Sequence, residues 1–300
     1  MYFMFNCFWT KAVIWYKSTE ITHFYDPVKQ YNFYLTNIDE ETYYLATLTG
    51  GFRCALANVI AFSSIMGRAG PLEAVFVVIF GTIGYELNRQ IIRGYNIDAG
   101  GSNAIFVFAG FMGLILGFFK YLKERTPETS TAQHFNYSAN RSSAAFALIG
   151  TLLTWVFFPI LAMDYYDASV SETPVYTGPY GVIFALCAAT IASFIFSALL
   201  NDGIVVRDII YGPIAGGVAS STASYWVVNP VYCVVIGAVA GSLQVLIMNL
   251  LEKKIAKSGS IFNTFSFTLF GIQGLVGAIF AAIWSAGIRT NQYGFSYKID

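Results

Sequence analysis

Eight long apolar segments constrain the fold of this chain more than any other feature of its sequence. An α-helix needs about 20 predominantly apolar residues to cross the hydrocarbon core of a bilayer. Helix is the expected element for each segment, because lipid offers no hydrogen-bond partner to open backbone groups. The sixth segment is the weakest, since it is short and rich in glycine. The eight lie near residues 43–66, 71–92, 102–122, 143–163, 179–200, 208–224, 230–251 and 264–287.

The composition favours a membrane protein over a soluble one. Hydrophobic residues make up 56% of the 300-residue chain and charged residues only 11%, whereas soluble domains carry about 25% charged residues. So few charges cannot coat a globular surface in water. The formal net charge of zero argues against a nucleic-acid partner. We therefore predict an all-α fold, a polytopic membrane helix bundle of about eight transmembrane helices.

The residue types that usually carry catalysis or bind metals form no recognisable constellation in the sequence. The four cysteines lack metal-ligand or redox spacing, and we interpret them as small apolar side chains. Both histidines, His23 and His134, lie outside the apolar segments. The sequence contains neither a nucleophile triad nor a phosphate-cradling loop. We therefore expect no enzymatic activity, no cofactor and no metal site.

The distribution of lysine and arginine predicts the orientation of the chain in the membrane. The internal connections on one side carry nine such residues, and those on the other side carry only two, Arg89 and Arg93. The basic side is expected to face the cytoplasm or a mitochondrial matrix, which places both termini on the opposite side. The nine residues are Arg68, Lys120, Lys123, Arg125, Arg141, Arg207, Lys253, Lys254 and Lys257.

We divide the chain into an aromatic N-terminal arm over residues 1–41, a transmembrane domain over 42–288 and a C-terminal tail over 289–300. The arm has neither the basic lead and cleavage site of a signal peptide nor the arginine-rich composition of a transit peptide. Its aromatic residues, among them Trp9 and Trp15, flank lysines. This pattern is typical of a short helix in the membrane interface or of an arm that binds another protein.

Small residues recur at the spacing that lets membrane helices pack closely. Gly113 and Gly117 lie four residues apart, as do Gly237 and Gly241. Three further glycines share one face of the last segment, and two more lie within the sixth. We expect all of these glycines at helix contacts; the last five are Gly271, Gly274, Gly277, Gly216 and Gly217.

The order of short motifs along the chain is more specific than the glycine spacing. The run Asp98-Ala99-Gly100-Gly101-Ser102 opens the third segment. The other motifs are Arg68-Ala69-Gly70-Pro71, Gly150 to Pro159, Ala215-Gly216-Gly217-Val218-Ala219, the set Pro230, Gly237 and Gly241, and Phe270-Gly271-Ile272-Gln273-Gly274-Leu275-Val276-Gly277. In this order they resemble the third to tenth helices of the Rh/ammonium-transporter (Amt/Rh) family. The resemblance covers about residues 42–287.

The resemblance implies a pore between two inverted five-helix repeats. The fourth to eighth segments would form the complete second repeat, and the first three would be the remnant of the first, so that the inverted repeat is incomplete. The family's first two helices and its long last helix with a cytosolic tail have no counterpart in this reading. Since the first helix contributes to the family's trimers, we do not expect the family-type homotrimer.

The resemblance aligns Phe106 and Phe270 with the two pore histidines of the family. A phenyl ring has no hydrogen-bond donor, no acceptor and no proton to exchange, and it is bulkier than an imidazole. Two facing rings would plug the path. We therefore expect no proton chemistry at these positions, which holds equally if the two rings are ordinary core aromatics.

The vestibule region of the family is altered as well. Where the family has an Asp-Phe pair, this chain reads Phe52-Arg53. The fixed positive charge of Arg53 would repel an ammonium ion about 4 Å away by about 4 kcal/mol at an effective dielectric of about 20. Glu86 lies within a residue of a vestibule glutamate. We expect Arg53 to pair with Glu73 or Glu86 across the first two helices, with a site for a partner protein and a transport role as alternatives. Asp98 is retained, and we expect it to cap the N-terminus of the third helix.

Two hypotheses for function follow. In the first, the chain is a non-conducting, Rh-like pseudo-transporter that serves as a structural subunit of a larger membrane protein complex. Its partners would be the lipid bilayer and other membrane subunits contacted by residues 1–41. A mitochondrial inner-membrane or respiratory assembly is its expected location, and the plasma membrane is the alternative. In the second hypothesis, it is a channel for ammonia, ammonium or another small neutral gas such as carbon dioxide.

Overall fold

The computed structural model describes residues 40–95, 98, 100–124, 141–163, 173–201, 203–226, 229–258 and 265–287. Every regular element in these ranges is helical, as the sequence predicts. Residues 1–39 of the N-terminal arm and the whole C-terminal tail lie outside the described residues, so the expectations for both stay predictions.

Each of the eight apolar segments forms one helix, close to the bounds expected from the sequence. The third and the last of these helices begin with a π-helical turn, labelled η2 and η4. The elements are α3 (Glu40–Ser63), α4 (Pro71–Tyr95), η2 (Ser102–Val107) followed by α5 (Phe108–Glu124), α6 (Arg141–Met163), α7 (Thr173–Leu200), α8 (Val206–Trp226), α9 (Pro230–Ser258), and η4 (Phe267–Ile272) followed by α10 (Gln273–Gly287).

Length and hydropathy divide the helices into strong and weak candidates for membrane spans. The apolar part of α3 is short, Leu48–Ser63. Helix α8, which the sequence marks as the weakest segment, is not among the six strong candidates, because buried hydroxyl residues such as Ser220 and Ser221 lower its hydropathy. The six are Pro71–Ile92, Ser102–Leu122, Ser142–Leu161, Gly178–Leu200, Pro230–Leu251 and Phe267–Trp284.

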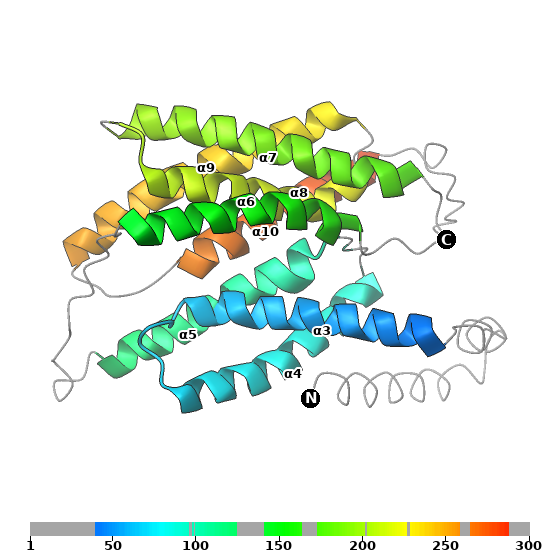
Figure 1. The fold of residues 1–300 in the computed structure, drawn as a ribbon, viewed down its shortest axis with the longest axis horizontal. Coiled ribbons are helices and arrows are strands. Elements are labelled where there is room, and N and C mark those ends of the chain that lie inside the picture. The colour runs from blue at the N-terminus through cyan, green and yellow to red at the C-terminus, as the bar shows by residue number, and fades with distance from the viewer. Residues whose placement is uncertain are drawn as a thin grey trace.

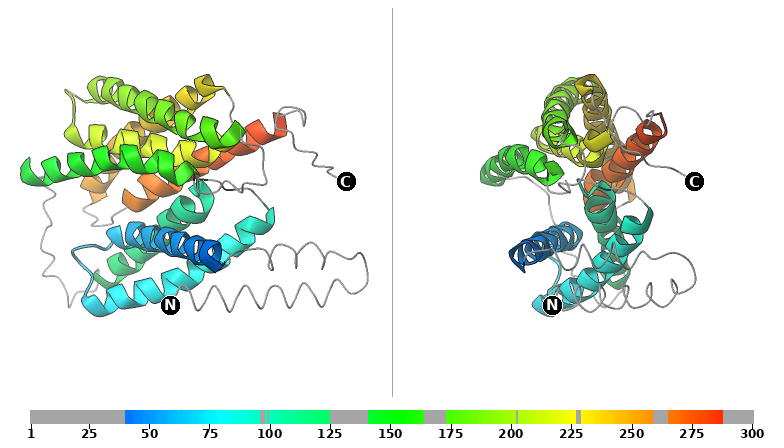
Figure 2. Two further views of the ribbon diagram at one scale, coloured as in Figure 1. Left: turned by 45° about the vertical axis from the view of Figure 1, so that its right-hand side comes forward. Right: turned by 90° about the vertical axis from the view of Figure 1, so that its right-hand side faces the viewer.

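The helices form two groups that meet where α5 and its π-helical turn contact η4 and α10 (Figure 1). Helices α3, α4 and α5 make up the first group, and α6 to α10 make up the second. Helix α8 lies at the centre of the second group, where it contacts α6, α7, α9 and α10. The end-on view of Figure 2 shows the two groups one above the other.

Glycines allow the two groups to approach at backbone distance. A Cβ atom at Gly110 in α5 would overlap the backbone of Gly271 in η4. A Cβ atom at Gly274 in α10 would lie 2.8 Å from the carbonyl oxygen of Ser102, which is closer than real Cβ atoms come. The contact between the groups therefore needs residues without a side chain at these points.

The other glycines that the sequence singles out also lie inside the bundle. Gly237 and Gly241 of α9 face the backbone of Ala185 and Ala189 in α7, so these two helices pack without intervening side chains. The remaining ones are Gly113 against Ser266, Gly216 against Ala189, Gly217 against the ring of Phe158, Gly277 against the backbone of Ala219, and Gly117, which is buried.

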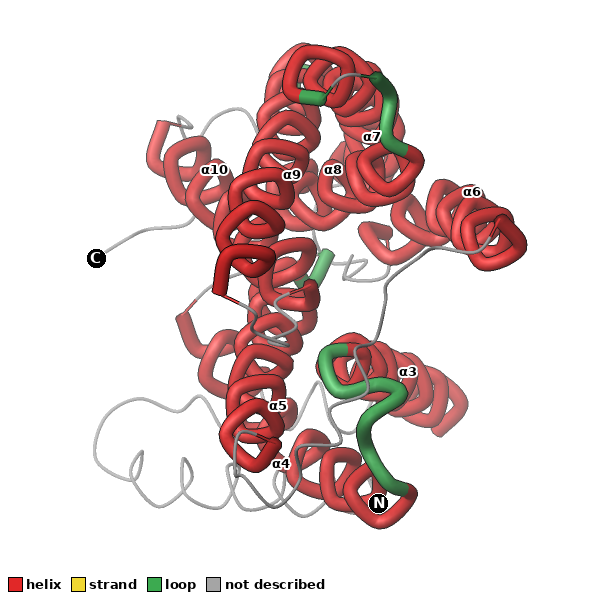
Figure 3. The backbone as a smooth tube through the Cα atoms, turned by 90° about the vertical axis from the view of Figure 1, so that its left-hand side faces the viewer, coloured by secondary structure: helices red, strands yellow, loops and turns green. Residues whose placement is uncertain are grey.

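The outer faces of the bundle carry large apolar side chains. On α3, α4 and α6, respectively, Phe52 is 68%, Phe80 is 64% and Phe146 is 75% exposed. Helices α3 and α6 lie on the same side of the bundle, opposite α10 (Figure 3). Apolar faces of this size suit a lipid or protein environment and not water.

Candidate functional site

The rings of Phe106 and Phe270 meet at the interface between the two helix groups. Phe106 belongs to η2 and Phe270 to η4. Their ring centroids lie 5.8 Å apart and their planes are 17° from parallel, which is a stacked arrangement. Phe106 is only 2% exposed. The two positions that the resemblance assigns to pore histidines are thus in direct contact with each other.

Further rings extend this pair into a continuous row, which we call the aromatic row. On one side, Phe158 of α6 contacts Phe106 with centroids 5.8 Å apart. On the other side, Phe265 meets Phe270 edge to face at 6.5 Å, and Tyr211 of α8 lies 4.7 Å from Phe265. Sequence reasoning did not single out Phe158, because only the fold brings α6 to the start of the third apolar segment.

The phenylalanines of the aromatic row form an apolar contact. Aromatic pairs at these separations gain about 0.5–1.5 kcal/mol each beyond the burial of their area. Phenyl rings offer no hydrogen bond and no titratable group at this point. The four phenylalanines can therefore pack against one another, but they cannot form conventional hydrogen bonds or relay a proton.

A small cavity lies between α3, α4 and the start of η2. It encloses about 20 Å³ and is lined by Arg53, Tyr85, Arg89 and Asp98, together with backbone and apolar atoms. This volume is close to the minimum that holds one water molecule. Of the three residues that the resemblance places in the vestibule, only Arg53 lines this cavity, whereas Phe52 is exposed on the outer face.

Asp98 ties the N-terminus of η2 to the second helix group. One of its carboxylate oxygens accepts hydrogen bonds from the backbone N–H groups of Asn103, at 3.1 Å, and Ala104, at 2.6 Å. The other accepts a hydrogen bond from the hydroxyl of Thr222 in α8. Burial raises the pKa of the Asp98 carboxyl above its ordinary value, while these donors and the nearby Arg53 favour its charged form.

The glycines beside Asp98 permit this arrangement. Gly101 has φ 73°, a left-handed conformation that favours glycine, and a Cβ atom at Gly100 would overlap the backbone of Ser221. Ser102 continues the contact with α8: its hydroxyl donates to the carbonyl of Val218 at 2.9 Å and accepts from the N–H of Thr222 at 3.1 Å.

The two acidic side chains expected to pair with Arg53 have other cationic partners in the structure. Glu86, fully buried, forms an ion pair with Arg89 at 2.7 Å on its own helix and accepts a hydrogen bond from Gln90 at 2.7 Å. Glu73 pairs with Lys120 at 2.9 Å. Because Arg89 follows Glu86 by one helical turn, this pair forms without any tertiary contact, and the sequence prediction overlooked it.

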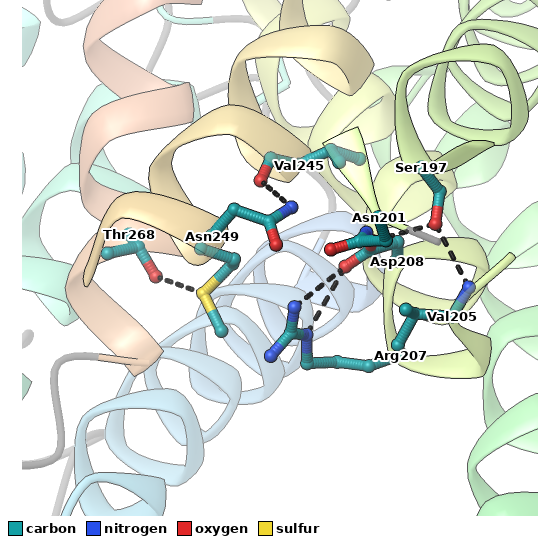
Figure 4. A network of polar contacts seen from close by, with 9 residues as sticks. Ser197, Asn201, Val205, Arg207, Asp208, Val245, Asn249 and Thr268 are labelled. Carbon is teal, nitrogen blue, oxygen red and sulfur yellow. Dashed lines mark hydrogen bonds and ion pairs between the residues drawn. The ribbon is translucent and has the colours of Figure 1, made fainter. Parts of the chain in front are cut away.

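A second polar cluster, also missed from the sequence, joins the end of α7 to the start of α8 (Figure 4). Asp208, 1% exposed, accepts hydrogen bonds from Ser197 at 2.9 Å and Asn201 at 3.2 Å and pairs with Arg207 at 3.1 Å. Ser197 in turn accepts from the N–H of Val205 at 3.0 Å. An acidic residue in the first turn of α8 was the available signal.

The described residues contain no group of three or more His, Cys, Asp or Glu side chains that could hold a metal ion. The polar groups around Asp98 and around Asp208 instead form hydrogen bonds with backbone N–H groups and with one another. The site thus combines apolar aromatic contacts with two clusters of hydrogen-bonded polar side chains.

The sequence of this chain is similar to sequences of ammonium transporters. The sequence matches a family model described as "Ammonium Transporter Family" over residues 12–298. It is 29% identical over 252 residues to "Ammonium transporter Rh type B" of Danio rerio, covering 80% of this chain and 52% of that protein. It is 29% identical over 254 residues to "Ammonium transporter Rh type B-B" of Xenopus laevis, with the same coverage of both chains. The chain spans about half the length of the curated relatives it matches.

Solved structures show the same fold. The chain superposes on a structure of Nitrosomonas europaea Rh50 with a TM-score of 0.66 and 24% identity, covering 77% of this chain and 60% of that one. A structure described as "Sensor Amt Protein" gives a TM-score of 0.62 at 18% identity, covering 77% of this chain and 58% of that one. At these identities the likeness concerns the arrangement of helices.

Proposed function

The chain belongs to the Ammonium Transporter Family, and from this premise we propose that it is a non-conducting member that serves as a structural subunit of a larger membrane protein complex. The observation that carries the proposal is the stacking of Phe106, which is 2% exposed, on the partly buried Phe270, with ring centroids 5.8 Å apart. These are the positions that the resemblance assigns to two pore histidines.

Several physical arguments support loss of conduction. A polar molecule moved into an apolar site without a hydrogen bond loses about 2–7 kcal/mol, and the phenyl rings offer no bond in return. Phe158 and Phe265 flank the stacked pair, so the apolar region extends beyond a single ring on each side. A solute passing this point would have to separate packed rings and cross them without a polar partner.

The proposed structural role rests on the apolar exterior. The exposed faces of α3, α4 and α6 offer contact area to lipid and to neighbouring subunits, and residues 1–41 are the segment that we expect to bind those subunits. We propose a mitochondrial inner-membrane assembly as the location, with both termini on the intermembrane-space side. The asymmetry of lysine and arginine between the two sides supports this orientation.

The second candidate function is a channel for ammonia or another small neutral gas. It is favoured by the family and by relatives whose names call them ammonium transporters. An apolar path without histidines would not hinder a gas that needs no hydrogen bond, provided that the rings can part.

Two experiments separate these functions. If the chain is a structural subunit, it should migrate with a large complex on a native gel of the source membrane, and its deletion should lower the amount of that complex. If it is a channel, purified protein should raise the ammonia permeability of lipid vesicles above that of protein-free vesicles. The structural proposal would be contradicted if the protein raised the ammonia permeability of the vesicles and migrated on the native gel only as a monomer or trimer.

A further inference from the structure

The cavity between α3, α4 and η2 brings an arginine close to a buried carboxylate. Arg53 of α3 and Asp98, which precedes η2, both line this cavity. Asp98 is 4% exposed, and the positive charge of Arg53 acts on its carboxylate by electrostatic attraction. Because the cavity encloses only about 20 Å³, a second group as large as a guanidinium does not fit beside Asp98 while Arg53 is there.

The charges around the cavity are balanced in two pairs. Arg89 also lines the cavity, but its guanidinium forms an ion pair with Glu86 at 2.7 Å. The groups that donate hydrogen bonds to Asp98 are two backbone N–H groups and one hydroxyl, all of them neutral. Arg53 is therefore the cation that balances Asp98 in this cavity.

Removal of the Arg53 side chain would create a negative charge without a partner and an empty space at the same place. A buried charge without a partner is costly. The empty space would have the size of the lost side chain and would border a carboxylate. A planar guanidinium matches a carboxylate because it can donate two parallel hydrogen bonds.

We propose that this cavity is a latent binding site for a guanidinium-type organic cation, which the side chain of Arg53 occupies as a tethered ligand. While Arg53 is present, the site is closed to such a cation from solution. Asp98 lies between the candidate spans Pro71–Ile92 and Ser102–Leu122, so a dissolved cation need not cross the hydrocarbon core to reach it.

The proposal is tested on the full chain in detergent or lipid nanodiscs, with the variant Arg53→Ala. The probe is ethylguanidinium, because it replaces the side-chain atoms beyond Cβ that this variant lacks. At several times its dissociation constant, it is expected to raise the melting temperature of the variant by about 2–4 °C, in a saturable way. Sodium chloride at equal ionic strength should not reproduce this rise. A density map of the variant with ethylguanidinium should show the ligand beside Asp98.

The wild type and the variant Lys120→Ala are the controls. In the wild type, Arg53 already fills the site. In Lys120→Ala, the carboxylate that loses its partner is that of Glu73, which lies in the first turn of α4 and is 38% exposed. Neither control should respond to ethylguanidinium.

The proposal would be overturned if Arg53→Ala showed no saturable rise, if either control showed an equal rise, or if ligand density appeared only elsewhere. If Arg53→Ala does not fold even with ethylguanidinium, a density map of the wild type decides. A guanidinium of Arg53 in contact with the Asp98 carboxylate would support the proposal, and one turned away from it would overturn it. The test measures binding and not conduction, so its failure is distinguishable from failure of the proposed function.

Discussion

The phenyl ring of Phe106 stacks on that of Phe270, with ring centroids 5.8 Å apart and ring planes 17° from parallel. The two rings come from different halves of the chain, and each is carried by a π-helical turn that precedes a long helix. Gly110, one turn beyond Phe106, contacts Gly271, the residue after Phe270. The ring contact therefore depends on a close backbone approach between the two halves.

Replacing Gly110 by alanine is expected to force α5 and η4 apart, because the added methyl group would overlap the backbone of Gly271. Overpacking of this kind typically costs about 1–3 kcal/mol, which would lower the melting temperature of the purified protein. Gly150 in α6 is a matched control, since a Cβ atom there meets no atom within 4 Å. Gly150→Ala should leave stability unchanged or raise it by up to about 1 kcal/mol. Equal melting temperatures for the two variants would contradict the packing described here.

Asn58 and Gly81 are expected to behave as a coupled pair. A Cβ atom at Gly81 would overlap Oδ1 of Asn58, whose amide nitrogen donates to the carbonyl of Cys54 at 3.0 Å. Gly81→Ala should therefore destabilise the contact between α3 and α4. In the double variant Asn58→Ala/Gly81→Ala, the loss should be smaller than the sum of the single losses by about 0.5–3 kcal/mol. Additive losses in a thermal-unfolding cycle would argue against direct contact.

The ion pair of Glu86 and Arg89 should matter far more for stability than that of Glu73 and Lys120. Arg89→Met removes the cationic partner of Glu86, whose carboxylate is fully buried. Breaking a buried ion pair in this way typically lowers the free energy of unfolding by about 3–5 kcal/mol. Lys120→Met affects a pair whose glutamate side chain is 38% exposed, and such pairs contribute about 0–1 kcal/mol. The double variant Glu86→Leu/Arg89→Met should recover much of the loss. Similar melting temperatures for Arg89→Met and Lys120→Met would contradict the expectation that the Glu86–Arg89 pair contributes more to stability than the Glu73–Lys120 pair.

Thr222 is expected to fasten the Asp98 segment to α8. Thr222→Val removes the hydroxyl that donates to the buried carboxylate of Asp98, and an unsatisfied buried partner costs about 1–3 kcal/mol. Thr190→Val is the control, because that hydroxyl donates to Leu186 of its own helix at 2.7 Å. A fall in melting temperature is predicted for the first variant and little change for the second, and the reverse order would contradict the role assigned to Asp98.

Much of the fold could be predicted from the sequence because bilayer thickness fixes the length of an apolar helix. All eight segments form helices, and six of those described are long and apolar enough to cross a membrane, whereas α3 and α8 are not. The positions of Phe106 and Phe270 came from the order of motifs, but their stacking needed the structure, since it depends on how two distant π-helical turns meet.

The pairing of charged residues was harder to predict. Arg53 was expected to pair with Glu73 or Glu86, yet the structure gives these carboxylates Lys120 and Arg89 as partners. The Glu86–Arg89 pair lies within one helix, whereas the Glu73–Lys120 pair depends on how α4 packs against α5. Phe158 was missed because an apolar ring in a membrane span carries no local signal of the ring that it will contact.

The most direct test of the central claim is the ammonia permeability of lipid vesicles that contain the purified chain, followed by stopped-flow measurement of internal pH. Vesicles containing the Rh type B protein of Danio rerio provide the expected conducting control, and protein-free vesicles set the baseline. With Phe106 stacked on Phe270, the chain is predicted to give the rate of protein-free vesicles. A rate clearly above that baseline, in proportion to the amount of protein reconstituted, would contradict the account.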